Sequence, residues 1–402
     1  MVNKGSFAMG LLTGFVAVLV LLIGFQFYSL VGGATGGMRP RDGQLAPMNK
    51  IEEIYRIIST NSIMPFDRDE MLENMYRGFV AGVGDPYTQY LCRESFEAFT
   101  TRTDGAFVGI GVRVLMDPAD RMLTLVSVFA DAPAGRAGLM PGDKVVTVDG
   151  IDVVGRTQQE IVGMITGIEG TNVNIGIFRP YENEHFEVDI IRERVVVPTV
   201  FHEMIETENG RTGYIRIDAF ERPTYQQFYD ALQELILDDM ESLIIDVRNN
   251  PGGLLDVVVD IANLLVPEGN VTFVEDVNGR RRYHPSNSTY LGIPLVILIN
   301  ERSASASEVL GGAVQDFGVG TLVGEQSFGK GSVQNLYRIS DGTAVKVTIA
   351  KYFTPNGASI HGIGLTPDFV VEMDEDLTRR IGEISHEEDV QLQIALVVVQ
   401  RK

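Results

Sequence analysis

The 402-residue sequence has few of the residues on which disulfides, metal sites and histidine-based catalysis depend. Its one cysteine, Cys92, cannot form an internal disulfide, and we expect it to be a small buried hydrophobic residue. There are five histidines, and none lies in a recognisable catalytic triad or in a His-Glu-x-x-His zinc motif. We therefore expect no metal and no other cofactor, and a serine-histidine-aspartate mechanism has no evident base.

Basic residues are also scarce, with 33 lysines and arginines against 54 acidic residues and a net charge of -21. A polyanion would meet a repulsive field at such a surface, so nucleic acid is excluded as a partner. The content of 45% hydrophobic and 22% charged residues is typical of globular proteins and argues against disorder. A chain of this length favours two or three domains.

The N-terminus contains the one long apolar run. No residue from Gly5 to Met38 is charged, and Phe7 to Leu30 is long enough to span a bilayer as a helix, which takes about 20 residues. We predict a transmembrane signal anchor at 1–31 and a flexible glycine- and proline-rich tether at 32–48. A cleavable signal peptide is the alternative, since Gly32-Gly33-Ala34 is a weak cleavage site.

Three segments of different periodicity follow. Residues 49–103 have helix-spaced apolar residues broken at Met64-Pro65, and 104–194 have short β-type runs with a helix at Thr157–Ile165. Residues 195–402 alternate strands with helices, which predicts a layered α/β core with a C-terminal helix. The expected core elements are strands at 212–217, 243–247 and 295–300, and helices at 225–237, 255–265 and 307–317. The fold class is therefore a multidomain α/β (α+β) protein.

A serine-rich turn joins a buried strand to a helix in the predicted core. The strand is Gly292–Asn300, and Glu301–Glu308 leads directly into the helix. A serine at a helix N-terminus lies beside free N–H groups and a partial positive charge, which favour a developing oxyanion. The alternative is structural, because Ser305-x-x-Glu308 is also a capping box.

A lysine lies in a glycine-rich loop farther along the chain, Gly324–Gly331. The loop nearly matches a phosphate-binding P-loop, but Gly331 takes the place of the required hydroxyl and a strand follows instead of a helix. We reject nucleotide binding. The glycines on both sides of Lys330 let its backbone bring the amine close to another segment, although an ordinary solvated lysine is the alternative.

A third stretch, Asp246–Gly253, is a strand end that runs into a glycine turn. Adjacent glycines let backbone N–H groups approach a substrate carbonyl, so this turn is a candidate part of an oxyanion hole. A plain strand-to-helix loop is the alternative.

Together these stretches resemble the C-terminal processing (tail-specific) peptidases, a family of PDZ-containing serine peptidases. The family motifs are Ser303-Ala-Ser-Ala-Ser-Glu308, Phe328-Gly-Lys-Gly-Ser-Val-Gln334 and Asn250-Pro-Gly-Gly253. The likeness also includes Asp85-Pro-Tyr-Thr-Gln-Tyr90 and Tyr352-Phe-Thr-Pro-Asn-Gly357, and it spans about 50 to 400.

The resemblance assigns roles to individual residues. The family's catalytic serine and lysine lie 25 positions apart, which selects Ser305 as nucleophile and Lys330 as base. The other implied residues are Gln334, which orients the lysine, Ala306 with Gly252 or Gly253 as the oxyanion hole, and Asp316 as a supporting acid. A lysine removes a proton only when neutral, so we expect burial to lower the pKa of Lys330.

Part of the 104–194 segment looks like a PDZ domain, which binds a chain terminus as an added strand. The similar stretches are Val108-Gly-Ile-Gly-Val112 and Ala137–Lys144. By this likeness the residues that bind the substrate C-terminus are Val108, Gly109, Ile110 and Gly111.

The resemblance implies a serine endopeptidase that cleaves proteins with free apolar C-termini near those termini. The apolar N-terminal run and the family match together imply a single-pass anchor in the cell membrane with the catalytic part outside the cytoplasm, and a homo-oligomer or an adaptor is left open. One alternative is a catalytically inactive, membrane-tethered PDZ scaffold. Another is an acyl-CoA-type lyase or isomerase, against which the PDZ-like segment argues.

Overall fold

The computed structural model describes residues 45–287 and 290–401 of the chain. The anchor predicted at 1–31 and most of the predicted tether lie outside these residues. Within the described ranges, no helix has both the length and the apolar character needed to cross a bilayer. The tether prediction is wrong at its end, because residues 45–48 already belong to the helix α2 (Leu45–Asn61).

The chain divides into two compact units, with the boundary between Leu72 and Glu73 inside the helix α3 (Arg68–Ala81). In the first unit, α2 ends at Asn61, three residues before the break predicted at Met64-Pro65. Phe66 packs edge-on against Tyr55, with ring centroids 6.5 Å apart, and the Arg68 guanidinium lies over the Tyr55 ring.

The second unit begins with short elements that lead into the domains predicted after residue 103. They are β1 (Gln89–Leu91) and α4 (Arg93–Asp104), and β2 (Ala106–Gly109) then pairs with β9 (Glu193–Val196). Cys92 was expected to be buried, but it is partly exposed at the N-cap of α4, with Sγ 3.1 Å from Ser95 Oγ. Helix α4 ends at Gly105, which takes the left-handed conformation with φ 59°.

Residues 112–191 form a small β domain with its own core. Its strands run in the order β3-β4-β5-β7-β8, and β6 pairs with β5. The bounds are β3 (Val112–Met116), β4 (Leu123–Val128), α5 (Pro133–Arg136), β5 (Lys144–Val148), β6 (Ile151–Asp152), α6 (Gln158–Ile165), β7 (Asn172–Arg179) and β8 (Glu184–Ile191). The predicted helix at 157–165 is confirmed, and Thr157 caps it with Glu160 in a capping box. The β3 strand lies at one edge of the sheet.

A six-stranded sheet in the order β10-β11-β12-β15-β16-β19 forms the centre of the α/β core. Its strands are β10 (Val200–Thr207), β11 (Gly210–Ile217), β12 (Ser242–Asp246), β15 (Leu295–Ile299), β16 (Thr321–Gly324) and β19 (Phe369–Val370). All pairs are parallel except β10 with β11. The helices are α7 (Thr224–Leu237), α8 (Leu255–Asn263), α9 (Ala306–Phe317), α10 (Glu375–Arg379) and α11 (Val390–Val399).

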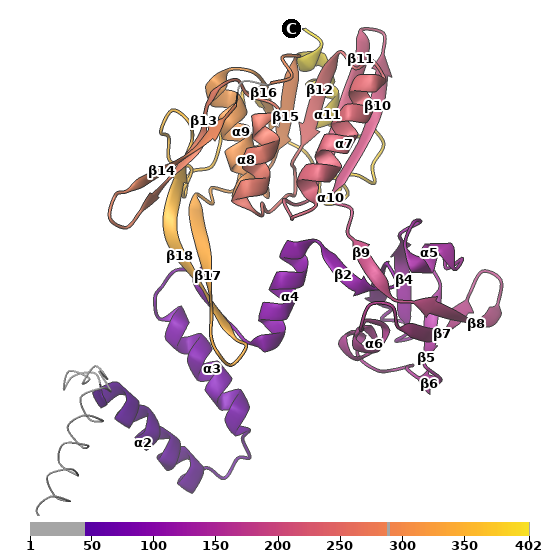
Figure 1. Cartoon of the computed structure of the whole chain (residues 1–402), viewed down its shortest axis with the longest axis vertical. Helices are drawn as coiled ribbons and strands as arrows, with labels where there is room; N and C mark the ends of the chain where they lie inside the picture. The colour runs from indigo at the N-terminus through magenta and orange to yellow at the C-terminus, as the bar shows by residue number, and fades with distance from the viewer. Residues whose placement is uncertain (1–44, 288–289, 402) are drawn as a thin grey trace, which may run out of the picture. The chain divides into compact units, whose positions relative to one another are not determined.

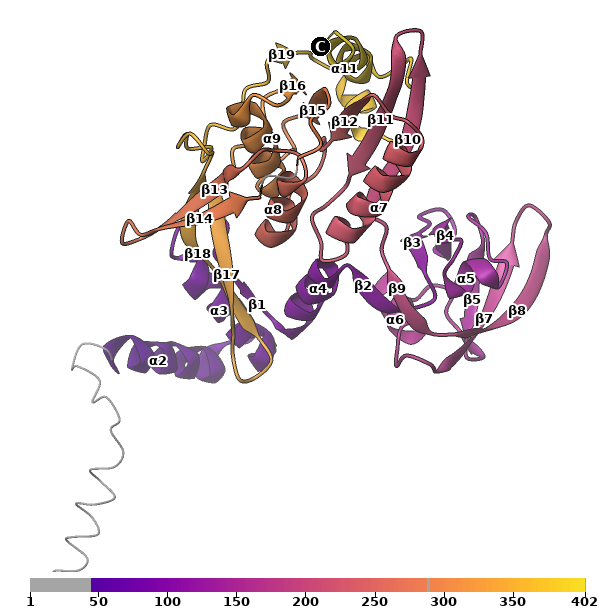
Figure 2. The ribbon, with the colours of Figure 1, turned by 45° about the horizontal axis from the view of Figure 1, so that its top comes forward.

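Helices cover both faces of this sheet (Figures 1 and 2). Alternate side chains of each strand point to opposite faces, so Ile245 packs with α7, α8 and α9 while its neighbour Ile244 packs with α11. A parallel sheet buried in this way needs continuous apolar strands, which explains why 243–245 and 295–299 contain no polar residue.

A second sheet carries a long hairpin that Figure 1 shows extending from the core. Its strands are β13 (Gly269–Asp276), β14 (Arg281–Ser286), β17 (Ser332–Arg338) and β18 (Ala344–Phe353). The β17 and β18 strands form the hairpin, and β1 pairs with the other side of β18. Residues 49–103 are therefore not purely helical as predicted, because Gln89–Leu91 is a strand of the core.

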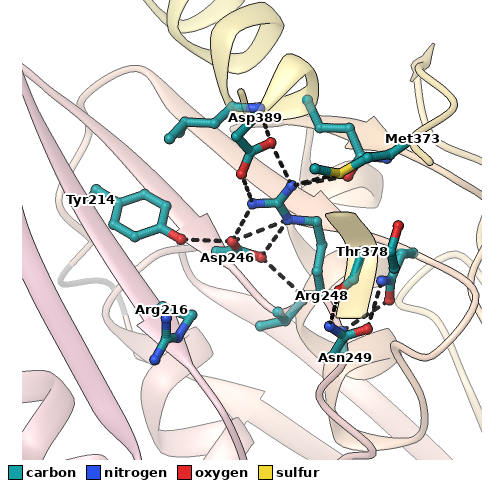
Figure 3. A network of polar contacts seen from close by, with 12 residues as sticks. Tyr214, Arg216, Asp246, Arg248, Asn249, Met373, Thr378 and Asp389 are labelled. Carbon is teal, nitrogen blue, oxygen red and sulfur yellow. Dashed lines mark hydrogen bonds and ion pairs between the residues drawn. The ribbon is translucent and has the colours of Figure 1, made fainter. Parts of the chain in front are cut away.

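A buried ionic network ties the C-terminal helices to the end of β12 (Figure 3). The guanidinium of Arg248 is fully buried and pairs with Asp246 at 2.6 Å and with Asp389 at 2.7 Å. Asp389 also caps α11, accepting the N–H of Leu392 at 3.0 Å. The Tyr214 hydroxyl donates to Asp246 at 2.7 Å. Asp389 is thus both a helix cap and half of the anion pair that neutralises Arg248.

Replacing Asp389 by alanine removes two charge-assisted hydrogen bonds of Arg248 together with the helix cap. We expect the free energy of unfolding to fall by about 3 kcal/mol or more. Asp374→Ala is the matched control, because Asp374 caps α10 in an exposed position and its loss should cost about 1 kcal/mol. Urea unfolding of both variants measures the difference, and equal losses would show that the Arg248 pair adds no stability.

Candidate active site

The three motifs singled out in the sequence follow three neighbouring parallel strands. The glycine turn follows β12, the serine turn follows β15, and the lysine loop follows β16. The carboxyl ends of parallel strands meet at one edge of a sheet, so the three loops come together there.

The serine turn presents one of its three serines to solvent. Ser303 and Ser307 are fully buried, and their hydroxyls donate to the carbonyls of Val247 at 2.8 Å and Asn250 at 2.9 Å. Ser305 is partly exposed and has φ 59° and ψ −113°, a backbone conformation that costs energy in a non-glycine residue. The two outer serines are structural, and Ser305 is the accessible one.

The glycine turn packs directly against the backbone of Ser305. A Cβ at Gly252 would lie 2.7 Å from both Ala304 O and Ser305 Cβ, and one at Gly253 would lie 2.1 Å from Phe220 O. Only glycine permits these contacts.

Two backbone donors at this point have no acceptor within residues 45–287 and 290–401. Gly252 N donates to Asn250 Oδ1 at 2.8 Å, so its N–H is used within the turn. Among the residues that the structure describes, the N–H groups of Gly253 and Ala306 donate to no acceptor. Of the three predicted oxyanion-hole residues, Gly253 and Ala306 therefore offer available donors, and Gly252 provides the close approach.

The lysine loop lies against the segment 360–364. A Cβ at Gly331 would lie 2.6 Å from His361 N, and Gly329, with φ 88°, accepts the N–H of Gly362 at 2.8 Å. The two glycines that flank Lys330 thus permit a close backbone approach, as the sequence predicts.

Glu308 joins the serine turn to the lysine loop. Its carboxylate is fully buried and accepts the N–H of Ser305 at 2.8 Å, as expected for a capping box. It also accepts Ser327 Oγ at 2.6 Å, Gly329 N at 2.7 Å and Lys330 N at 2.8 Å. One side chain therefore positions the backbones of both Ser305 and Lys330.

Tyr352 forms a second link between the same residues. Its buried hydroxyl donates to the carbonyl of Lys330 at 2.5 Å. Burial raises the pKa of Tyr352 well above its ordinary value, and the nearby Ser305 side chain opposes this rise. The phenol therefore stays protonated beside both residues.

The amine of Lys330 lies in a partly desolvated position. Burial lowers the pKa of Lys330, the charge of Lys346 lowers it further, and Glu308 opposes the shift. The amine Nζ lies 4.9 Å from the centroid of the Tyr87 ring. The expected lowering of the pKa of Lys330 is therefore present. Within the described part of the chain, however, no hydrogen bond joins the side chains of Lys330 and Ser305.

The sequence is similar to known peptidases. Residues 211–371 match the model of Peptidase family S41. The carboxy-terminal processing protease CtpB of Bacillus subtilis is 34% identical over 327 residues, which cover 81% of this chain and 68% of that protein. The chain belongs to peptidase family S41.

Other proteins similar to this S41 peptidase are also named as C-terminal processing proteases. A carboxyl-terminal-processing protease of Synechocystis is 34% identical over 352 residues, covering 87% of this chain and 78% of that protein. A solved structure, the photosystem II D1 C-terminal processing protease, has 30% sequence identity and a TM-score of 0.48, and the match covers 80% of this chain and 86% of that one. The chain is a serine peptidase of the carboxy-terminal processing type.

Two predicted residues of the S41 peptidase form hydrogen bonds with groups other than the serine and the lysine. Gln334 Nε2 donates to Ser332 Oγ at 2.9 Å and to Thr348 Oγ1 at 3.2 Å, and not to Lys330. Asp316 lies near the end of α9, about 16 Å along the helix from Ser305. Its carboxylate accepts the N–H of Asn356 at 2.7 Å and so fixes the turn after β18.

The predicted terminus-binding residues lie at the entrance to the small β domain. Val108 and Gly109 belong to β2 and pair with Arg194 and Glu193, as members of the β2–β9 ladder. Ile110 and Gly111 follow β2, and their carbonyls accept the N–H groups of Ala134 and Phe129.

Sequence reasoning did not identify the full role of Glu308 or any role for Tyr352 and Tyr87. Glu308 was interpreted only as a cap partner, yet an acidic residue in a helix turn that is otherwise small and apolar is a signal of a buried, fully bonded carboxylate. Tyr352 and Tyr87 both lie inside quoted motifs, but only the fold shows that they meet Lys330.

Replacing Glu308 by glutamine should disrupt both loops, because an amide turns two of the four acceptor positions into donors that face N–H groups. We expect the free energy of unfolding to fall by about 2 kcal/mol or more and the peptide cleavage rate by about 100-fold. Urea unfolding and a peptide cleavage assay read by mass spectrometry measure the two effects. Glu301→Gln, an exposed residue in the same turn, should change neither by a comparable amount; a fully active Glu308→Gln enzyme would contradict the positioning role.

Proposed function

We propose that this peptidase cleaves protein substrates near their C-termini with a Ser305–Lys330 dyad. The observation that carries the proposal is the buried Glu308 carboxylate, which holds the accessible serine and the desolvated lysine on adjoining loops. Because Ser303 and Ser307 are committed to backbone carbonyls, Ser305 is the nucleophile that the turn offers.

The chemistry follows from the positions of the donors and the amine. Neutral Lys330 accepts the Ser305 proton as the hydroxyl oxygen attacks the substrate carbonyl, and the N–H groups of Gly253 and Ala306 stabilise the resulting oxyanion. The lysine then gives that proton to the leaving amine, and it activates a water molecule that hydrolyses the acyl-enzyme. The intact serine, lysine and glycine turn do not favour the inactive scaffold as an alternative.

Ser305→Ala and Lys330→Met should each abolish cleavage of an unstructured peptide with an apolar C-terminus. In the parent enzyme, kcat/KM should rise with pH through the lowered pKa of Lys330, because only the neutral amine accepts a proton. Lys330→Arg should not rescue activity, since arginine stays protonated. Appreciable turnover by Lys330→Met, or a rate that does not change with pH while chemistry is limiting, would identify another base.

The same lowered pKa makes a prediction about stability. Between the folded-state pKa of Lys330 and its ordinary value of 10.5, the unfolded chain binds more protons than the folded chain. The free energy of unfolding that this residue contributes therefore rises with pH across that window, and the penalty is full below it. Lys330→Met should remove the penalty, so its stability advantage over the parent in urea unfolding should be largest below the window and shrink above it.

We further propose that the small β domain recognises the substrate C-terminus as a PDZ domain does. Support comes from the sheet order, in which the edge strand β3 offers one side to an added strand. The N–H groups of Ile110 and Gly111, just before β3, donate to no acceptor among the described residues and are suited to a terminal carboxylate.

A free apolar C-terminus should then speed cleavage. Amidating the terminus of the test peptide, or ending it in aspartate, should raise KM or lower kcat/KM, because the carboxylate or the apolar contact is lost. The comparison uses three peptides that differ only in the last residue or its end group. Equal rates for all three would exclude this role for the domain while leaving the dyad untouched.

A further inference from the structure

Tyr87, whose ring lies beside the Lys330 amine, belongs to a tight turn near the N-terminal end of the second unit. Asp85 shapes this turn, since its carboxylate accepts the N–H of Tyr87 at 3.1 Å and the hydroxyl of Thr88 at 2.6 Å. Thr88 is buried and its Oγ1 accepts the N–H of Thr348 on β18 at 3.1 Å. The turn is therefore attached to the hairpin that begins two residues after Lys330.

Strand pairing fixes the turn further. β1 follows Thr88 directly and pairs with β18, where Gln89 is opposite Lys346 and Leu91 is opposite Ala344. The neighbouring strand β17 places Gln334 opposite Thr348. Tyr87 is thus held by backbone hydrogen bonds on one side and by the Asp85 side chain on the other, and its ring is a fixed part of the lysine's surroundings.

Four further titratable groups lie around Lys330 and the ring of Tyr87. Glu308 faces the lysine from α9, the buried phenol of Tyr352 from β18, and Lys346 also from β18. Asp85 interacts with Lys346 and with Tyr87.

The phenol of Tyr87 stays neutral under assay conditions. Burial raises the pKa of Tyr87, and the charges of Asp85 and Glu308 raise it further. The lysine therefore meets an uncharged aromatic face, which attracts an ammonium ion and does not attract a neutral amine.

We infer that Tyr87 is a positioning residue that holds protonated Lys330 on its ring and releases the amine to Ser305 once the proton is lost. The inference rests on the proposed Ser305–Lys330 dyad. The ammonium is held over the ring, 4.9 Å from its centroid, and is not hydrogen-bonded to Ser305. Loss of the proton to solvent removes the cation–π attraction, and the neutral amine is then free to accept a hydrogen bond from the serine hydroxyl.

This assignment predicts the sign of a change in the pH profile. The ring stabilises only the protonated lysine, so removing the ring makes deprotonation easier. A side chain that acted only by excluding water would have the opposite effect, because admitting water stabilises the ammonium. The direction of the shift therefore separates the two roles.

The test measures kcat/KM against pH for the full-length chain with Tyr87→Phe and Tyr87→Leu. The leucine variant should move the acidic limb to lower pH by about one unit, and the phenylalanine variant should leave it close to the parent. Tyr90→Leu is the matched control, because Tyr90 belongs to the same segment but bonds to Glu73 and packs on Tyr76. No shift in Tyr87→Leu, or a shift to higher pH, would overturn the inference.

A series of fluorinated phenylalanines at position 87 tests the same point without changing shape. Each fluorine weakens the negative face of the ring, so the acidic limb should move down in steps as fluorine is added. These variants remain informative if the leucine variant does not fold. A constant limb across the series would also overturn the inference.

A measurement without turnover separates this inference from the dyad itself. In a Ser305→Ala background, competitive labelling with an amine-selective reagent and mass spectrometry of the Lys330 peptide reports the pKa of the amine. Tyr87→Leu should lower that value by about the shift seen in kcat/KM. An unchanged pKa of Lys330 would contradict the role of Tyr87 without contradicting the dyad. Full activity of Lys330→Met would contradict the dyad, whatever the labelling shows.

Discussion

The candidate active site of this S41 peptidase depends on one buried carboxylate. Glu308 has no contact with solvent and accepts four hydrogen bonds, one from the serine turn and three from the lysine loop. A buried charge is tolerated only when its acceptor positions are filled, so the two loops have one relative position that satisfies it. The backbones of Ser305 and Lys330 are therefore fixed relative to each other.

The remaining structure brings these loops within reach of one side chain. Parallel strands β12, β15 and β16 are neighbours, and their carboxyl ends deliver the glycine turn, the serine turn and the lysine loop to one edge of the sheet. The Arg248 network fastens the C-terminal helices to the first of these strand ends (Figure 3). The glycine turn thus starts from a residue that cannot shift without exposing a buried ion pair.

Much of this organisation could be predicted from the sequence, because it rests on local patterns. The apolar runs at 243–247 and 295–300 and the glycine turns follow from local composition, whereas the choice of Ser305 among the three serines rests on the family resemblance. The strand β1 could not be predicted, since three residues show no period and their pairing partner β18 is distant in sequence. The distance of Asp316 from Ser305 could have been predicted, because eleven residues along a helix separate the two. The contacts of Tyr87 and Gln334 depend on hairpin register, which no local pattern determines.

The pairing of β1 with β18 has a consequence for the order in which the enzyme matures. The chain is synthesised from its N-terminus, so Gln89–Leu91 is made early. It cannot pair until Ala344–Lys346, its partners near the end of the core, have been made. Contacts between segments so far apart form late, because a long loop must close first. The ring of Tyr87 thus reaches the Lys330 amine only when nearly the whole catalytic core has folded, so the surroundings of this lysine are complete only in the finished chain.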